Sequence, residues 1–174
     1  LMGDINKGES MTMAPIVAGE KVIVGNSGGE FGVRGWWAGL ETETGISSWR
    51  ADSTGPDSQV LIGSNFKPFY AEDRGKDLGV KTWQGDQWKI GGGAAWGWIS
   101  YDPSLDLIYY GTSNASPWNA DMRPGDNKWT STLFARKPET GEAVWAYQMN
   151  PHDNHDYDGV NENILLDLTV HGQQ

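Results

Sequence analysis

A repeated pattern of strand, Thr-Gly turn and strand ending in tryptophan constrains the fold of this chain most. Residues 39–49, GLETETGISSW, align with residues 135–145, ARKPETGEAVW, and Thr-Gly stands at the same place in both copies. Glycine adopts the backbone conformations that tight turns between strands require. We therefore expect two equivalent antiparallel hairpins, with Trp49 and Trp145 at matching positions.

The spacing of the two copies indicates a β-propeller. Trp49 and Trp145 lie 96 residues apart, and half of that distance falls near the ~40–50-residue period of propeller blades. We therefore expect an intervening blade that includes residues 99–111. A β-sandwich is the competing architecture, because it also joins short strands by frequent turns. The Thr-Gly-x-x-x-Trp repeat favours the propeller, in which the indole would dock between neighbouring blades.

The rest of the chain is typical of an all-β protein. Helical periodicity is nearly absent, and the sequence contains 24 Gly and 10 Trp, which suit tight turns and flat packing surfaces between layers. Turn sequences separate the expected strands, which are residues 16–17, 21–24, 107–110, 132–135 and 143–147. Residues 52–86 carry no clear strand, and in propellers such excursions often build the site on one face.

Composition excludes several classes of function. The formal net charge of −10 argues against binding to nucleic acid or to an anionic membrane, because both favour a basic face. No apolar run is long enough to span a bilayer. Cysteine is absent, which rules out thiolate metal sites and disulfides within this sequence. The chain begins with Leu1 and stops at Gln174, and we expect it to be a piece of a longer protein.

The segment 154–159, NHDYDG, places two carboxylates two residues apart in a loop. On an extended backbone Asp156 and Asp158 would point to the same side, and their mutual repulsion favours a cation between them. A hard cation prefers such oxygen ligands. A polar surface turn is the structural alternative. A zinc site from His152, His155 and Asp156 is a second alternative, although capping of the turn is the more typical use of His155.

Three further segments combine glycine with polar or aromatic side chains. Residues 25–35 surround Glu30 with glycines, residues 88–98 place three glycines before Trp96, and residues 111–119 contain Asn114. Glu30 and Asn114 offer oxygen ligands, and the glycines before the indole could clear space for a flat cofactor. Read singly, each segment also fits a structural role: a turn with a solvated glutamate, tryptophan packing between blades, and an asparagine in a turn.

Together, in this order, the four segments resemble the bacterial alcohol dehydrogenases that depend on pyrroloquinoline quinone (PQQ), and among these the methanol dehydrogenases. The resemblance covers essentially the whole chain and rests on long specific runs: residues 12–15, TMAP, 28–35, GGEFGVRG, 123–129, RPGDNKW, and 151–156, PHDNHD. It implies that residues 1–174 are part of an eight-bladed propeller domain, about three to four blades, with no second domain.

The resemblance also implies roles for individual residues. The implied metal ligands are Glu30, Asn114 and Asp156, and Asp156 is also the implied catalytic base. Trp96 would stack under the PQQ ring, and Trp118 would form a wall of the small substrate chamber. The implied polar and backbone contacts to PQQ are Thr12, Ser27, Gly28 and Gly29. Two departures from the family pattern, Ala94 and Ala115, put one hydrogen bond to PQQ and the stiffness of one loop in doubt.

Asp158 separates two branches of that family. Calcium-dependent methanol dehydrogenases have a small residue there, whereas the lanthanide-dependent branch is similar to this chain in having Asp. Affinity for hard cations rises with the charge of the ligands. Glu30, Asp156 and Asp158 supply three negative charges, which match a trivalent ion, whereas two would suit Ca²⁺. We therefore expect a light lanthanide, with calcium as the alternative.

The activity implied by the resemblance is PQQ-dependent oxidation of methanol, or of a similar small primary alcohol, to the aldehyde. Hydride would pass to PQQ, and cytochrome c would accept the electrons. The parent protein is expected to be periplasmic and homodimeric, with no membrane span and no nucleic-acid partner. Because the piece alone cannot close the ring, we expect it to be inactive by itself. Two alternatives remain, a calcium-dependent PQQ alcohol dehydrogenase and a non-catalytic propeller scaffold.

Overall fold

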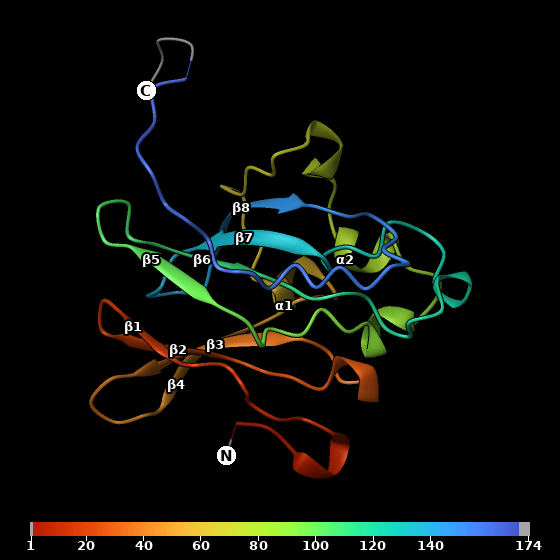
Figure 1. Ribbon diagram of the computed structural model, residues 1–174, viewed down its shortest axis with the longest axis horizontal. Helices are drawn as coiled ribbons and strands as arrows, with labels where there is room; N and C mark the ends of the chain where they lie inside the picture. The colour runs from red at the N-terminus through yellow and green to blue at the C-terminus, as the bar shows by residue number, and fades with distance from the viewer. Residues whose placement is uncertain (1, 171–174) are drawn as a thin grey trace.

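The computed structural model describes residues 2–170, so Leu1 and residues 171–174 of the expected domain lie outside the described part. The described residues form two four-stranded antiparallel sheets, and each is a simple meander (Figure 1). The first sheet contains β1 (Ile16–Ala18), β2 (Lys21–Gly25), β3 (Trp36–Glu41) and β4 (Ser47–Asp52). The second contains β5 (Ile99–Asp102), β6 (Leu107–Gly111), β7 (Thr132–Arg136) and β8 (Ala143–Gln148). The all-β prediction and the expected strands are confirmed.

Only short helical turns interrupt the strands. They are η1 (Ile5–Lys7), η2 (Gly29–Phe31), α1 (Asp57–Val60), η3 (Ala71–Arg74), α2 (Leu78–Lys81), η4 (Gln87–Ile90) and η5 (Ala120–Met122). The excursion between β4 and β5 lies along the edge of the second sheet, because Lys67 and Phe69 donate backbone hydrogen bonds to Val144 and Ala146 of β8. Between residues 2 and 170 we find no helix whose length and hydropathy would let it cross a membrane.

The two Thr-Gly repeats form equivalent hairpins. Gly45 and Gly141 have φ values of 68° and 70°, which are left-handed conformations that favour glycine. Both hairpins also contain an irregularity in strand register at the aligned position, between Gly39 and Leu40 in one and between Ala135 and Arg136 in the other. The repeat predicted from the sequence is therefore confirmed down to its backbone detail.

The number of blades was predicted wrongly. Trp49 lies in β4 and Trp145 in β8, the last strands of two successive sheets. The distance of 96 residues therefore covers one blade and a long excursion, not two blades. Residues 99–111, expected as an intervening blade, form β5 and β6 of the second sheet. Residues 2–170 thus contain two blades instead of three to four, because an excursion without sheet periodicity lengthened the repeat.

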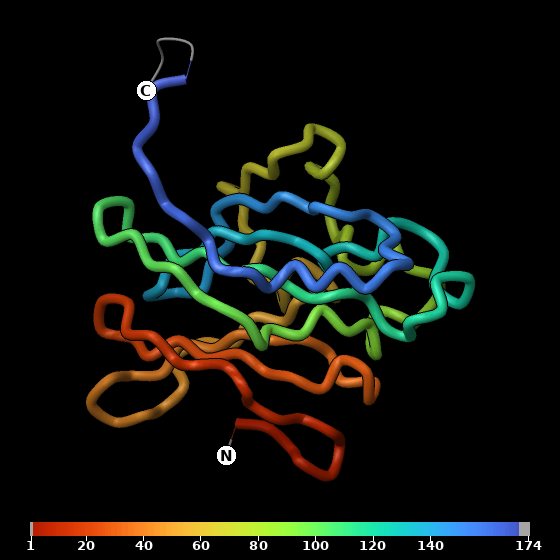
Figure 2. The backbone as a smooth tube through the Cα atoms, in the orientation of Figure 1, coloured from red at the N-terminus to blue at the C-terminus, as the bar shows by residue number. Residues whose placement is uncertain are grey.

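The core lies between the facing sheets, which Figure 2 shows one above the other. Ile23 and Trp37 of the first sheet are buried in the same cluster as Ile108, Tyr110 and Phe134 of the second. The rings of Trp37 and Tyr110 lie 3.7 Å apart between their centroids. Side chains alternate along a strand, and burial of such aromatic surface is the main stabilising term in a core of this kind.

Trp49 fastens the first blade to the second. Its indole Nε1 donates a buried hydrogen bond of 2.8 Å to the carbonyl oxygen of Pro138, in the Thr-Gly turn of the other blade. Gly141 leaves room for the ring, because a Cβ there would lie 2.4 Å from the indole Cε3. Lys21 adds a second link, since its Nζ donates to Glu139 Oε1 at 2.9 Å. The expected docking of tryptophan between blades is confirmed for Trp49.

Trp49→Phe is expected to destabilise the full-length protein by about 2–3 kcal/mol, because the buried carbonyl of Pro138 loses its donor and the smaller phenyl ring leaves a cavity between the blades. The midpoint of chemical denaturation measures this change. Trp98→Phe is the matched control, because Trp98 is 62% exposed. Equal losses from the two substitutions would contradict a specific role for the interblade hydrogen bond.

Candidate functional site

The loops that carry the candidate residues gather at one end of the two sheets, on the right of Figure 1. Residues 25–35 connect β2 to β3, and residues 111–131 connect β6 to β7. Residues 149–159 follow β8, and residues 91–98 lead into β5. Because adjacent antiparallel strands return to the same end of a sheet, segments that are distant in the sequence meet there.

Glycines let two of these loops approach backbone to backbone. Gly35 donates its N–H to the Gly92 carbonyl oxygen at 2.7 Å, and Ala95 donates to Asn26 O at 2.7 Å. A Cβ on Gly35 would lie 1.8 Å from the carbonyl oxygen of Gly93, so a larger residue would force the loops apart. The glycine-rich runs therefore position the polypeptide around the site.

The loop that carries Asn114 is fixed to both neighbours. Gly93 donates its N–H to the carbonyl oxygen of Asn114 at 2.9 Å. The buried hydroxyl of Ser116 donates to the carbonyl oxygen of Gly29 at 2.7 Å, next to Glu30 in the sequence. These contacts set the distance between the predicted oxygen ligands.

Three of the four predicted metal ligands share one cavity. Glu30, Asn114 and Asp156 line a cavity of about 360 Å³, and Trp118 forms part of the same wall. The other lining residues are Gly32, Ile90, Ser116 and Pro117. Side chains that are up to 126 residues apart in the sequence thus meet in the folded chain.

An adjoining cavity of about 590 Å³ is lined by Thr12, Trp96 and Asp158, together with Met13, Ala14, Gly97, Trp98, Tyr157, Val160 and Asn161. Thr12 Oγ1 and Ser27 Oγ form a hydrogen bond of 2.5 Å, so two of the predicted PQQ contacts lie side by side. Trp96 is 36% exposed, which leaves part of its indole uncovered. Asp158 therefore lines the neighbouring cavity and not the one that contains Asp156.

The backbone of the acidic loop differs from the expected extended form. Asp156 and Asp158 have φ values of 60° and 50°, in the left-handed region. The alternation of an extended strand therefore does not apply, and the two carboxylates are directed by the loop and its contacts. This explains why they line two adjoining cavities.

The carboxylates still act on one another electrostatically. Burial, followed by the charges of Asp156, Glu30 and Asp153, raises the pKa of Asp158 to about 6. The pKa of Asp156 is also raised. The largest cause is partial desolvation of its carboxyl group, although the residue as a whole is exposed, and the charges of Asp153 and Glu30 add to it. Like charges disfavour the ionised form, and a bound cation reverses this effect.

The chemistry of these residues fits a hard cation, since two carboxylates and an amide oxygen line one cavity and a third carboxylate is adjacent. Within the described residues 2–170, however, no three Asp, Glu or His side chains converge closely enough to hold an ion as they stand. The same observation gives no support to zinc bound by His152, His155 and Asp156. His152 Nδ1 instead lies 2.8 Å from the Gly125 carbonyl oxygen, and His155 stacks on Tyr157.

Sequence reasoning gave no role to two buried residues beneath the site, Asp153 and Arg123. Asp153 accepts hydrogen bonds from the N–H groups of His155 and Tyr157, on both sides of Asp156. Arg123 donates to the carbonyl oxygens of Trp118 and Asp153. An aspartate two residues before a turn amide is a signal of an Asx turn and could have identified Asp153.

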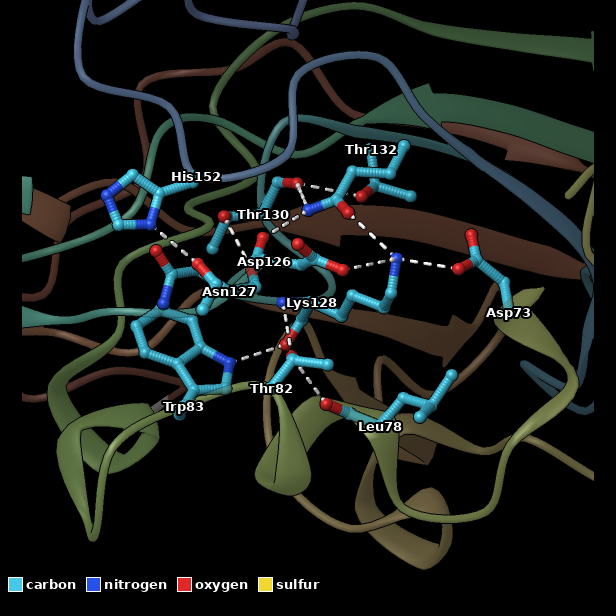
Figure 3. Close-up of polar contacts among 12 residues, drawn as sticks. Asp73, Leu78, Thr82, Trp83, Asp126, Asn127, Lys128, Thr130, Thr132 and His152 are labelled. Atoms are coloured by element: carbon cyan, nitrogen blue, oxygen red, sulfur yellow. Dashed lines mark hydrogen bonds and ion pairs between the residues drawn. The ribbon is translucent and has the colours of Figure 1, made fainter.

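A buried ion pair fixes the long excursion under these loops (Figure 3). Lys128 Nζ lies 2.6 Å from Asp73 Oδ1 and 3.7 Å from Asp126 Oδ2. Trp83 Nε1 donates to the Lys128 carbonyl oxygen at 2.6 Å, and the Lys128 N–H donates to Thr82 Oγ1 at 2.9 Å. Removing one partner of a buried pair leaves an uncompensated charge, so these contacts resist separation of the excursion from the site.

Comparison with known proteins assigns the family. A family model described as "PQQ: Glucose/ethanol/alcohol dehydrogenase, beta-propeller domain" matches residues 2–174. The chain belongs to this PQQ alcohol dehydrogenase family. The resemblance inferred from the sequence is confirmed, and the two sheets are blades of this propeller domain.

Relatives within the PQQ alcohol dehydrogenases include methanol dehydrogenases that are named as lanthanide-dependent and others that are named for cytochrome c. The chain is 58% identical over 172 residues to the lanthanide-dependent methanol dehydrogenase of Methylacidiphilum fumariolicum strain SolV, covering 98% of this chain and 28% of that protein. It is 53% identical over 165 residues to methanol dehydrogenase [cytochrome c] subunit 1 of Methylorubrum extorquens, covering 93% and 26%. A solved europium-containing methanol dehydrogenase matches with a TM-score of 0.95 and 57% identity, covering 99% and 30%. The chain thus spans less than a third of these relatives.

Proposed function

We propose that the full-length protein containing this chain is a PQQ-dependent methanol dehydrogenase of the lanthanide-dependent type. One observation carries the proposal: Glu30, Asn114 and Asp156 come from three separate loops and line one cavity. Beside it, Asp158 lines a second cavity with Thr12 and Trp96. Oxygen ligands for a hard cation thus adjoin a partly exposed indole, an arrangement that suits a flat cofactor above a metal.

In this proposal Glu30, Asn114, Asp156 and Asp158 hold the cation, which requires Asp158 to turn toward the cavity of the other three. The three carboxylates match the charge of a trivalent ion. Contacts to PQQ come from the indole of Trp96 and from Thr12, Ser27, Gly28 and Gly29. Bound there, PQQ would supply the hydride-accepting chemistry, and the cation would supply Lewis acidity toward it.

Asp156 is the proposed general base. Its carboxylate lines the same cavity as Trp118, which would form one wall of the chamber for a small primary alcohol. Neighbouring acids raise the pKa of Asp156, and a cation beside it would favour the ionised form that accepts a proton. The hydroxyl proton of the alcohol would pass to this carboxylate.

The remaining parts of the proposal follow the family. Cytochrome c is the proposed electron acceptor, as in the printed name of the Methylorubrum extorquens relative. We also propose a periplasmic location and a homodimeric parent, from the family resemblance alone. Residues 2–170 supply two blades, so the activity is proposed for the full-length protein only.

A calcium-dependent enzyme is the second candidate. The identities to the lanthanide-dependent and cytochrome c relatives, 58% and 53%, are too close to separate the two classes by themselves. Asp158 favours the lanthanide, because it adds a third negative charge near Glu30 and Asp156.

Dye-linked oxidation of methanol by metal-stripped full-length protein, with PQQ present, tests the proposal. We expect La³⁺ to restore activity and Ca²⁺ to restore much less, because the site carries three acidic ligands. Restoration by Ca²⁺ alone would favour the second candidate. Full activity without added metal, after the metal content is verified as negligible, would contradict both.

A further inference from the structure

We propose that Asp153 is a positioning residue that fixes the conformation of residues 154–158 and thereby directs Asp156 into the cavity. This inference rests on the proposed function, because the cation is the probe of the site. Asp153 is only 2% exposed, whereas residues 154–157 are exposed. A buried carboxylate beneath an exposed loop requires hydrogen-bond partners, and their identity shows what the carboxylate holds.

The carboxylate of Asp153 accepts four hydrogen bonds. Its Oδ1 accepts from Asn150 Nδ2 at 2.7 Å and from the His155 N–H at 2.9 Å. Its Oδ2 accepts from the Tyr157 N–H at 3.2 Å and from Ser131 Oγ at 3.4 Å. The two backbone donors immediately flank Asp156, so the direction of the Asp156 side chain depends on the carboxylate of Asp153.

The loop needs such support because its backbone is strained. Asp156 and Asp158 both lie in the left-handed region, with φ values of 60° and 50°. Residues other than glycine adopt this conformation at a cost in free energy, and it persists only where surrounding contacts hold it. The hydrogen bonds to the N–H groups of His155 and Tyr157 supply these contacts.

Arg123 connects this support to the opposite wall of the cavity. The guanidinium is fully buried and donates to the carbonyl oxygens of Asp153, at 2.5 Å, and of Trp118, at 3.2 Å. It also donates to Pro117 O at 2.6 Å and to Asn127 Oδ1 at 2.8 Å. The planar guanidinium of arginine thus connects Pro117 and Trp118, in the wall of the cavity, to Asp153 at the start of the acidic loop. These hydrogen bonds fix the distance between the two segments.

Asp153→Asn in the full-length protein tests the inference, with Tb³⁺ binding measured by its luminescence. An amide of the same shape cannot accept all four hydrogen bonds, because its nitrogen is a donor. We expect the Kd for Tb³⁺ to rise by about 10–100-fold, the usual effect of removing an outer-shell partner of a metal ligand. The Tb³⁺ luminescence lifetime in H₂O should also shorten, because water would replace a misaligned carboxylate.

Asp121→Asn is the matched control, because it removes an exposed acidic charge in η5. It should leave both the Kd and the lifetime unchanged, while the thermal midpoint verifies folding of each variant. Asn150→Ala removes one hydrogen-bond donor to Asp153, at a half-buried residue, and should raise the Kd for Tb³⁺ several-fold. This variant tests the inference if Asp153→Asn does not fold.

The outcomes separate this inference from the proposed function. If the protein without substitutions does not bind Tb³⁺, the proposed metal site is wrong and the positioning role of Asp153 is overturned as well. If the unvaried protein binds Tb³⁺ and the folded Asp153→Asn variant binds it with the same Kd and lifetime, only the positioning role of Asp153 is overturned. Unchanged values for Asn150→Ala, where Asp153→Asn is unfolded, would also overturn it.

Discussion

Asp156→Asn in the full-length protein is expected to lower kcat for methanol oxidation by about 10²–10⁴-fold, the contribution of a positioned general base. The amide keeps the shape of the side chain and one carbonyl oxygen in the cavity shared with Glu30 and Asn114. It cannot accept the hydroxyl proton of the alcohol. Steady-state kinetics with La³⁺ and PQQ at saturating concentrations measure the loss.

Metal retention separates the two roles assigned to Asp156. Tb³⁺ titration of Asp156→Asn shows whether a cation still binds, and kcat is interpreted only for the metal-loaded variant. Asp121→Asn, in the exposed turn η5, serves as the control and should retain full activity. A metal-loaded Asp156→Asn variant with unchanged kcat would remove Asp156 from the reaction.

Asp158→Ala is expected to reverse the metal preference of the site. Removing one of three acidic side chains leaves Glu30 and Asp156, whose two charges suit Ca²⁺ better than a trivalent ion. We expect the Kd for La³⁺ to rise at least about 100-fold, because even outer-shell partners of metal ligands contribute about 10–100-fold. The Kd for Ca²⁺ should change far less. Chelator competition with metal-stripped full-length protein measures both constants.

Asp158→Asn provides a matched comparison, because it removes the charge and keeps an oxygen. An intermediate Kd for La³⁺ is expected for this variant. Lanthanide-dependent activity at unchanged metal affinity in Asp158→Ala would show that Asp158 does not bind the ion and that the third charge has no part in selectivity.

The hairpins of this fold were predictable from the sequence because their determinants are local. Gly45 and Gly141 fix the turns, and Trp49 and Trp145 mark the same strand position in each copy. The number of blades was not predictable from the spacing of these marks. The excursion between β4 and β5 has no sheet periodicity of its own, and it adds residues without adding a blade.

The convergence of three predicted ligands on one cavity was predictable from the sequence, whereas the geometry of the acidic loop was not. Resemblance to PQQ dehydrogenases selected Glu30, Asn114 and Asp156, and the fold brings them to one cavity. The sequence did not predict that Asp158 lines the adjoining cavity. Its placement follows from the left-handed backbone of the loop, which aspartate tolerates but does not by itself indicate. Asp153 carries only the weak local signal of an Asx turn, because two of its partners are the backbone N–H groups of His155 and Tyr157.

The central feature of the proposed site is one cation bound by side chains from separate loops. A crystal structure of the full-length protein grown with PQQ and La³⁺, with anomalous scattering to locate the metal, tests this most directly. We predict a single strong peak within about 2.3–2.6 Å of oxygens from Glu30, Asn114, Asp156 and Asp158, the range for large hard cations. A peak elsewhere, or one bound without Asp158, would contradict the account.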